Sequence, residues 1–259
     1  QGLEFSKLNK MNIFFIGSGS NLLVSDQGIN GMVISIKKSF RNFSINNTRV
    51  FAETGTMLGR IVNSTIKEGL TGLESLVGVP GTLGGALIMN AGAYGSEISN
   101  YLKSVEVVTK EGIIKKYQSD DMKFSYRNSN FSDEEILISA EFELNKANKE
   151  EINKKKIHAN KGRRSSQPLK FRSAGSVFKN PKEGPAGYFI EKAGLKGLRS
   201  GNAEISKKHA NFFINYGDAK AKDLVKLILT AKKLVKKLFN INLELEIQTL
   251  GFKKGTFEL

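Results

Sequence analysis

Ser176 is the residue of this chain whose surroundings most suggest chemistry. It lies in the segment SAGSVFKNP, between small residues and a Lys-Asn-Pro turn. A hydrolase-type serine needs a histidine as its base, and no histidine lies near Ser176 in the sequence. The serine hydroxyl could still donate a proton to a strongly basic carbanion or enolate formed beside it.

Arg127, Glu246 and His209 are the other polar candidates, and each has an ordinary structural explanation. Arg127, in FSYRNSNF, sits just before a polar turn, where an arginine more often makes a surface ion pair. Glu246, in LELEIQTLG, is one of two glutamates on the polar face of an expected strand. His209, in KKHANFFIN, is better explained as a polar residue at a strand entrance than as a metal ligand. Taken singly, none of these residues names a reaction.

Two loops of small residues could hold a phosphate-bearing ligand. Residues 76–95 read LVGVPGTLGGALIMNAGAYG, and the loop 81–85 runs into an apolar segment that could begin a helix. A second loop, Gly17-Ser18-Gly19-Ser20-Asn21, follows the apolar run 13–16. Glycine lets another molecule approach the backbone closely, and free N–H groups at such turns suit a pyrophosphate. Together the loops suggest a nucleotide cofactor with a diphosphate, although turn chemistry explains either loop alone. Neither fits G-x-G-x-x-G followed by a helix.

The composition limits the class of protein. With 259 residues, 39% of them hydrophobic, the chain can bury a real core in one large domain or two smaller ones. It contains no cysteine, which excludes disulfides and thiolate metal sites, and its two histidines argue against a histidine-rich metal centre. We therefore expect no metal. No apolar run is long enough to span a bilayer and no signal peptide opens the sequence, so we expect a cytoplasmic protein.

The formal net charge of +15 would suit nucleic acid, an anionic membrane surface or an acidic small molecule. Only eight of the 40 basic residues are arginine, however, and the interleaved aromatic and arginine positions of a stacking groove are not visible. The densest lysine groups, at 154–156 and 232–237, fall on expected helices. We interpret most of the charge as a solvated lysine-rich surface that would still benefit a phosphate-bearing ligand.

The elements expected to position these residues are short strands mixed with amphipathic helices. Strands are expected at 11–24 (interrupted by the first loop), 31–36, 45–52 (a hairpin arm after the Asn46-Asn47 turn), 104–109 and 113–117 (a compact hairpin around 110–112), 136–144, 176–178, 211–215 and 243–250. Helices are expected at 56–68, in the lysine-rich stretch up to 161, at 188–193 and at 219–239, the last with Asp218 as a candidate cap. The basic face of that last helix could sit on a membrane, but a core-facing helix with solvated lysines is favoured. This order predicts an α+β fold.

A set of motifs, taken in order, resembles the UDP-N-acetylenolpyruvoylglucosamine reductase family. The motifs are GSGSNLLVSDQGINGMVI, GLESLVGVPGTLGGALIMNAGAYG, FSYRNS, SAGSVFKNP, GYFIEKAGLKG, KKHANFFIN and LELEIQTLG. The resemblance covers roughly residues 12–252, and the combination is highly specific. It implies an FAD-binding domain of the vanillyl-alcohol-oxidase/PCMH type at 1–165 and a smaller α+β substrate-binding domain at 166–240. Residues 241–259 would form a C-terminal strand that returns to the FAD-binding domain.

The resemblance also implies an activity and a role for each site residue. Members of the family reduce an enolpyruvyl ether of a UDP-sugar with NADPH, which yields UDP-N-acetylmuramate for peptidoglycan. Hydride would pass from NADPH to FAD and then to C3 of the enolpyruvyl group. Arg127 and Glu246 would stabilise the C2 enolate, and Ser176 would protonate C2 as the general acid. Lys179, Asn180 and His209 match substrate-side positions. The positions matching the FAD site are Gly17, Ser18, Gly19, Ser20, Asn21, Leu22, Gly78, Pro80, Gly81, Thr82, Gly84, Gly85, Asn90, Gly92, Ala93, Tyr94 and Gly95.

Three features depart from the family pattern. The family usually begins with an additional N-terminal segment, containing a Thr-rich stretch before a Gly-Gly pair, whereas this chain starts almost at the first glycine loop. Leu245 replaces the proline often found before the catalytic glutamate. Only six residues separate Pro181 from Tyr188, so the insertion that carries a substrate-capping tyrosine is absent and the chain is similar to the compact subtype.

Three alternatives stay open at the level of sequence. The chain could be another FAD-linked oxidoreductase of the same fold, such as an oxidase, although the trio Arg127, Ser176 and Glu246 speaks against it. It could be a basic nucleic-acid-binding protein, or an inactive remnant of the family. The favoured interpretation is a reductase that uses FAD and NADPH on a UDP-sugar, without nucleic acid or membrane partners and as a monomer.

Overall fold

The computed structural model describes residues 1–259, and the chain divides into two compact units. The first unit comprises residues 1–18 and 31–163, and the second comprises residues 19–30 and 164–259. The three divisions fall inside the first glycine loop, after residue 30 and inside helix α4 (Lys149–Ser166). We expected residues 241–259 to return to the FAD-binding domain. They fall in the second unit together with residues 19–30, which the expected FAD-binding domain at 1–165 included.

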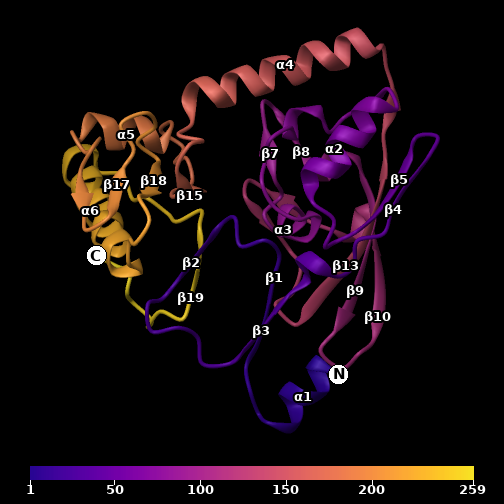
Figure 1. The fold of residues 1–259 in the computed structure, drawn as a ribbon, viewed down its shortest axis with the longest axis horizontal. Helices are drawn as coiled ribbons and strands as arrows, with labels where there is room; N and C mark the ends of the chain where they lie inside the picture. Colours follow the sequence, from indigo (N-terminus) through magenta and orange to yellow (C-terminus); the bar gives the residue numbers. More distant parts are fainter. The chain divides into compact units, whose positions relative to one another are not determined.

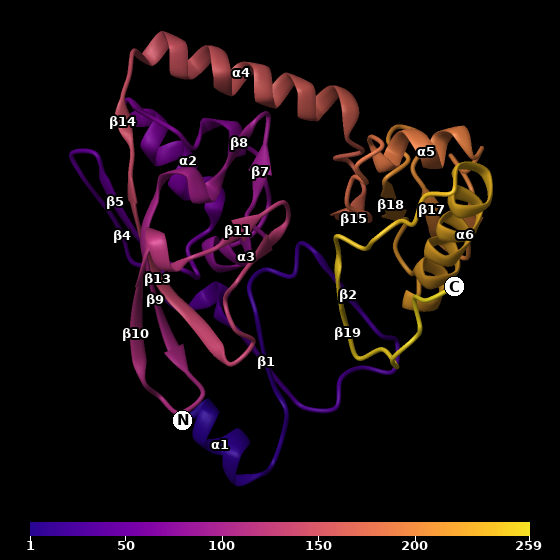
Figure 2. The same ribbon diagram turned by 180° about the vertical axis from the view of Figure 1, so that it is seen from behind.

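A five-stranded antiparallel sheet is the framework of the first unit (Figures 1 and 2). Its strand order is β10-β9-β13-β5-β4. The strands are β4 (Phe43–Asn46), β5 (Arg49–Glu53), β9 (Leu102–Thr109), β10 (Ile114–Gln118) and β13 (Glu135–Glu143). The β4–β5 turn places Asn47 at φ 53° and the β9–β10 turn places Gly112 at φ 89°, a region that asparagine and glycine tolerate. Both hairpins confirm the sequence prediction.

Shorter elements complete the first unit. Its helices are α1 (Gly2–Leu8), α2 (Leu58–Lys67) and α3 (Leu83–Ile88). Strands β1 (Ile13–Ile16) and β3 (Met32–Ser35) form a parallel pair. The remaining pairs are antiparallel: β6 (Leu70–Thr71) with β14 (Asn145–Lys146), β7 (Gly92–Ala93) with β8 (Ser96–Glu97), and β11 (Phe124–Ser125) with β12 (Asn128–Ser129). The helix expected at 56–68 is confirmed, and α3 begins where the glycine loop meets the apolar segment.

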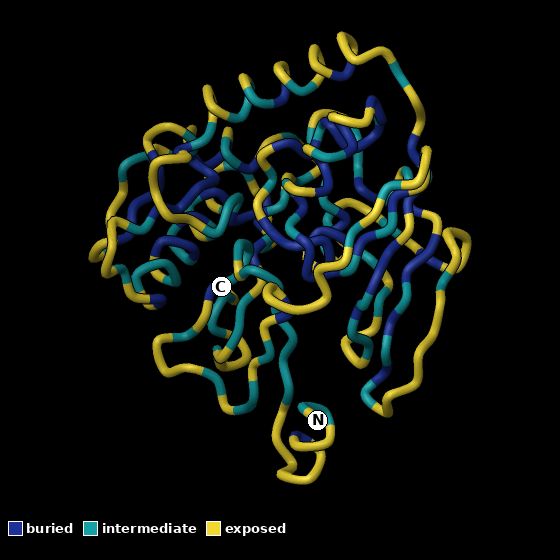
Figure 3. The backbone as a smooth tube through the Cα atoms, turned by 45° about the vertical axis from the view of Figure 1, so that its right-hand side comes forward, coloured by how far each residue is buried: buried dark blue, intermediate teal, exposed yellow.

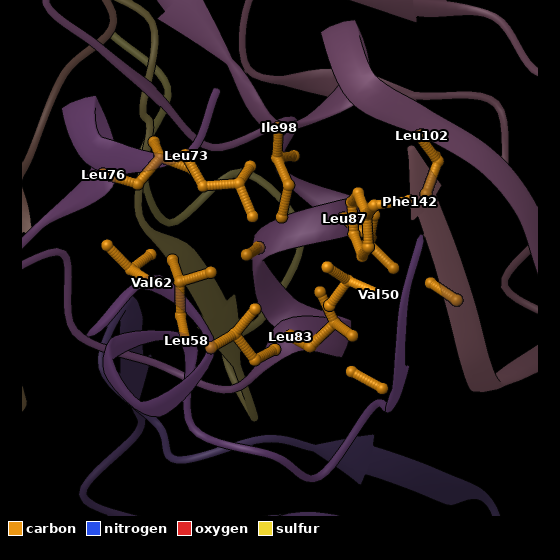
Figure 4. Close-up of a cluster of buried hydrophobic side chains, with 14 of the residues drawn as sticks. Val50, Leu58, Val62, Leu73, Leu76, Leu83, Leu87, Ile98, Leu102 and Phe142 are labelled. Atoms are coloured by element: carbon orange, nitrogen blue, oxygen red, sulfur yellow. The ribbon is translucent and has the colours of Figure 1, made fainter. Parts of the chain in front are cut away.

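The core of the first unit explains why α2 and α3 form. Leu58 and Val62 of α2 face Leu83 and Leu87 of α3 in a cluster that also holds Phe142 of the sheet (Figure 4). Each of these side chains is at most 1% exposed. Burial of one such side chain stabilises the fold by about 1.5–3 kcal/mol, so this cluster fixes the start of α3 against the sheet.

The second unit is a four-stranded antiparallel sheet covered by two helices. The strand order is β15 (Arg172–Ser176), β18 (Phe212–Asn215), β17 (Ala203–Ile205) and β16 (Arg199–Ser200). Helices α5 (Ala186–Lys192) and α6 (Ala221–Phe239) pack with this sheet, and β2 (Leu22–Val24) pairs in parallel with β19 (Gln248–Leu250). Ile228, Ala231 and Val235 of α6 are completely buried, which confirms the core-facing amphipathic helix.

Three local expectations were wrong. Asp218 does not cap α6; Asp26 accepts hydrogen bonds from the backbone N–H groups of Ala221 (2.7 Å) and Lys222 (3.0 Å). The strand expected at 176–178 lies earlier, as β15, and ends at Ser176. The strand expected at 243–250 is regular only over β19, because residues 244–246 contact the segment 177–179 while 248–250 pair with β2.

Helix α4 confirms the helix expected up to residue 161 and continues to Ser166. Only Ile152 and Ala159 of this helix are buried, so most of its turns are exposed or half-buried (Figure 3). The lysines at 154–156 therefore fall on a largely solvated helix, as the charge pattern indicated.

Candidate active site

The second glycine loop turns tightly before α3 in the first unit. Gly78 and Gly81 have φ values of 75° and 128°, which only glycine adopts easily. At the far end of the stretch, the β7–β8 turn holds Tyr94 at φ 52° and Gly95 at φ 81°. Both turn residues are exposed. The stretch therefore contains two turns with positive φ values, one before α3 and one between β7 and β8.

Two buried hydroxyls beside this loop have no hydrogen-bond partner in the protein. They are Thr82 Oγ1, at the N-cap of α3, and Thr56 Oγ1. A buried polar group without a partner costs stability, so such an atom commonly serves a ligand. Gly17 of the first loop approaches so closely that a Cβ at this position would overlap Thr82 Oγ1. Close approach of glycine backbone and unsatisfied hydroxyls fit a diphosphate-bearing cofactor such as FAD.

Arg127 occupies the two-residue turn of the β11–β12 hairpin with φ 55°. Its Nη2 donates to the carbonyl oxygen of Gly92 at 3.2 Å, and its guanidinium carbon lies 4.9 Å from the centre of the Tyr126 ring. A third contact fixes the hairpin, since Ser129 Oγ donates to the carbonyl of Ile88 at 2.8 Å. The structure thus holds Arg127 against the glycine-rich stretch, a contact that the sequence did not reveal.

Asn90 strengthens the same attachment. Its side chain is completely buried, and Nδ2 donates to Glu97 Oε2 at 2.7 Å and to the carbonyl of Ser125 at 3.2 Å. We expected Asn90 among the FAD-binding residues; its Nδ2 ties the glycine stretch to the Arg127 hairpin, and its buried Oδ1 has no hydrogen-bond partner in the protein. Neither Asn90 nor Glu97 was singled out from the sequence for this role.

Ser176 ends β15 immediately after an irregularity in the strand. Pairing with β18 runs from Ser173 opposite Ile214 to Ser176 opposite Phe212, so Ala174 and Gly175 form a bulge. Gly175 takes φ 82° inside this bulge. A bulge re-aims the side chain that follows it and is frequent beside active sites. Ser176 is half-buried, as a proton donor that must reach a substrate should be.

Glu246 lies beside Ser176 in the second unit. Its backbone N–H donates to the carbonyl of Val177, the residue after Ser176, at 2.8 Å. Phe178, which follows Val177, and Leu245, which precedes Glu246, form an antiparallel bridge. The structure therefore places the backbone of Glu246 next to the residue that follows Ser176, although Ser176 and Glu246 are 70 positions apart in the sequence. Arg127 belongs to the first unit.

The three expected substrate-binding residues lie in the second unit. Lys179 donates its backbone N–H to the carbonyl of Glu244 at 2.9 Å, and Asn180 Oδ1 accepts the N–H of Ala186 at the start of α5. His209 Nδ1 accepts the N–H of Asn211 at 3.2 Å, and its ring packs edge-on against Phe212. Burial, helped by the charge of Lys196, lowers the pKa of His209 from its ordinary value, so the neutral ring is favoured. With Nδ1 accepting, the proton of that neutral ring lies on Nε2.

Asn211 is a positioning residue that sequence reasoning missed. It is 2% exposed, and its amide bonds both to the N–H of Phe178 (2.9 Å) and to the carbonyl of Phe178 (2.7 Å). Its backbone carbonyl accepts the N–H of Val177 at 2.8 Å. These contacts fix the backbone immediately after Ser176. The signal was available, since Asn211 stands inside the motif KKHANFFIN.

Comparisons with known proteins match two parts of the chain to two domain families. Residues 3–117 match the family model for an FAD binding domain, and residues 167–250 match that for the C-terminal domain of UDP-N-acetylenolpyruvoylglucosamine reductase. The reductase of that name from Carboxydothermus hydrogenoformans is 43% identical over 250 residues, which cover 96% of this chain and 83% of the relative. The one from Caldicellulosiruptor bescii is 46% identical over 252 residues, covering 96% and 80%. The chain belongs to the UDP-N-acetylenolpyruvoylglucosamine reductase family.

A solved structure of the family supports the fold. The crystal structure of UDP-N-acetylenolpyruvylglucosamine reductase (MurB) from Thermus caldophilus matches with a TM-score of 0.84 at 35% identity, covering 96% of this chain and 90% of that one. The α+β class and the combination of an FAD-binding domain with a second, family-specific domain are thereby confirmed. Two of the three alternatives, an oxidase of the same fold and a nucleic-acid-binding protein, lose support, because the match extends over the C-terminal domain of the family. No helix has the length and apolar character to cross a membrane.

Proposed function

We propose that this chain reduces UDP-N-acetylglucosamine enolpyruvate to UDP-N-acetylmuramate in peptidoglycan synthesis, with FAD and NADPH. The observation that carries the proposal is a half-buried Ser176 that follows a bulge and precedes Val177, whose carbonyl accepts the backbone N–H of Glu246. This arrangement belongs to a chain that shares 43–46% identity with reductases of that name. An acid and a carboxyl group on adjoining backbone suit protonation of an enolate.

The two glycine loops are the proposed FAD site. Residues 17–22 and 78–95 would bind the diphosphate chiefly through main-chain groups, and the hydroxyls of Thr56 and Thr82 are further donors. FAD, when bound, carries the hydride between NADPH and the enolpyruvyl group. The protein supplies binding, orientation and charge.

Arg127, Glu246 and Ser176 have separate tasks in this proposal. After hydride arrives at C3, negative charge develops on the enolate at C2, and the fixed positive charge of Arg127 stabilises it. Glu246 contributes as a protonated or hydrogen-bond-bridged carboxyl group, since an ionised one would repel the enolate. Ser176 then donates its hydroxyl proton to C2.

The substrate-side residues present donors to an anionic UDP-sugar. Lys179 supplies an ammonium group, Asn180 an amide, and His209 the Nε2–H of a neutral ring. The net charge of +15 attracts anionic ligands in general, so it gives no selectivity for a UDP-sugar. We also propose that the protein works in the cytoplasm as a monomer.

Ser176→Ala tests the proton-donor assignment. The variant keeps the bulge and its backbone, so NADPH reduces the flavin at the wild-type rate under anaerobic conditions. Turnover of the enolpyruvyl substrate falls by at least about a hundredfold, because general acid catalysis contributes about that much. Stopped-flow absorbance measures the two half-reactions separately.

Ser200→Ala is the matched control, since Ser200 lies on β16 of the same sheet. It should leave both half-reactions at wild-type rates. Equal survival of both half-reactions in Ser176→Ala would show that another group protonates C2.

A further inference from the structure

The carbonyl oxygen of Glu246 accepts a hydrogen bond from Asn21 Nδ2 at 3.1 Å. The two residues are 225 positions apart, and both belong to the second unit. In the same contact, the carbonyl of Asn21 accepts the N–H of Gln248 at 2.9 Å. Asn21 therefore contacts the backbone on the C-terminal side of Glu246 through both its side chain and its main chain.

Glu246 is held from two sides by these bonds. Its N–H donates to Val177, directly after Ser176, and its carbonyl receives the Asn21 amide. When both peptide groups flanking a residue are fixed, its φ and ψ are fixed, and the direction of its Cα–Cβ bond follows. Loss of the Asn21 bond would leave the peptide group after Glu246 with the longer hydrogen bond from the N–H of Ile247 to the carbonyl of Val177, at 3.4 Å.

The segment that carries Asn21 is itself anchored in the second unit. Strand β2 pairs in register with β19, from Leu22 opposite Gln248 to Val24 opposite Leu250. Ser25 continues this ladder through its N–H, which donates to the carbonyl of Leu250 at 2.9 Å. Asp26 binds the first turn of α6. Asn21 thus extends from a fixed support, as a residue that orients another must.

We propose that Asn21 is a positioning residue for Glu246, in addition to its place in the first glycine loop. Its amide orients the Glu246 backbone and thereby the carboxyl group that faces the developing enolate. This assignment rests on the proposed function. It links the loop expected to bind the cofactor diphosphate to the group that acts on the substrate, through one side-chain hydrogen bond.

Asn21→Asp is the sharpest test, because it keeps the shape and replaces the donor by an oxygen that faces the Glu246 carbonyl. Because Asn21 also belongs to the proposed FAD site, both rates are expressed per bound flavin, and the reduction of that flavin by NADPH should slow less than its reoxidation. Reoxidation by the enolpyruvyl substrate should slow roughly tenfold or more, the effect of losing one orienting hydrogen bond. Asn21→Ala should show the same split. Asn30→Asp, an exposed asparagine in the same segment, is the matched control and should leave both rates unchanged.

Backbone hydrogen exchange over residues 244–250 gives a readout that does not depend on activity. Protection there should fall in Asn21→Asp and stay at the wild-type level in Asn30→Asp. Unchanged protection, or a loss of flavin with equal slowing of both half-reactions, overturns the positioning role. A wild-type protein that never reduces the enolpyruvyl substrate overturns the proposed function instead, and the exchange result still decides whether Asn21 holds the Glu246 backbone.

Discussion

The side chains of Arg127 and Ser176 are each oriented by one residue with a left-handed backbone conformation. Arg127 takes φ 55° at the tip of its hairpin, and Gly175 takes φ 82° just before Ser176. The sequence identified both site residues by their motifs, but not these backbone features. A bulge depends on which residues of β18 pair with β15, and that information lies about 40 residues further along the chain. The motifs therefore identified Arg127 and Ser176, but not the backbone conformations that orient their side chains.

His209 should make stability dependent on pH. In the unfolded chain a histidine titrates near 6.5, and burial lowers the pKa of His209 in the fold. Between these two pKa values the unfolded chain binds a proton that the folded chain does not, so stability falls as pH drops from above 6.5 through the folded pKa. His209→Gln should reduce this loss, as measured by thermal unfolding between pH 7.5 and pH 5 in steps of about half a unit. A variant that keeps the full wild-type pH dependence would assign the effect to other groups.

The helices and hairpins predicted from the sequence agree with the structure where the apolar periodicity is strong. Helices α2 and α6 and the hairpins β4–β5 and β9–β10 were predicted, because apolar spacing and turn residues specify them locally. The residue that caps α6 was not predicted from the sequence. The nearest acidic residue before the helix is Asp218, but the carboxylate that binds its first turn comes from Asp26, nearly 200 residues earlier. A cap supplied by tertiary contact has no local signature.

The cap of α6 gives a direct comparison of two aspartates. Asp26→Ala removes two hydrogen bonds and a negative charge from the helix N-terminus and should lower the melting temperature. Asp218→Ala, which makes no hydrogen bond to α6, should leave it unchanged. The Asp26 effect should disappear in acid, because bonds from Lys222 and Ala221 lower the pKa of Asp26 and the stabilisation is lost as pH falls through that lowered value. Differential scanning calorimetry of both variants measures this, and equal melting temperatures would contradict the assignment of the cap.

At the scale of the whole molecule, the chain leaves the first unit within its first glycine loop and returns by residue 31. The excursion, residues 19–30, supplies β2, Asn21 and Asp26 to the second unit. The sequence predicted two domains with a boundary at 165/166, and the two units of the structure divide at 163/164, inside α4. It could not predict the excursion, because parallel pairing of β2 with β19 joins segments that are 226 residues apart. Only the fold reveals that the first glycine loop contributes to both units.

The central claim is that this chain binds FAD, takes hydride from NADPH and passes it to an enolpyruvyl UDP-sugar. The visible absorption spectrum of the purified protein, supplied with FAD under anaerobic conditions, tests it most directly. Flavin bands should be present, should bleach on addition of NADPH, and should recover when UDP-N-acetylglucosamine enolpyruvate is added. A protein that stays colourless after exposure to FAD, or a bleached flavin that the enolpyruvyl substrate does not reoxidise, would contradict the account.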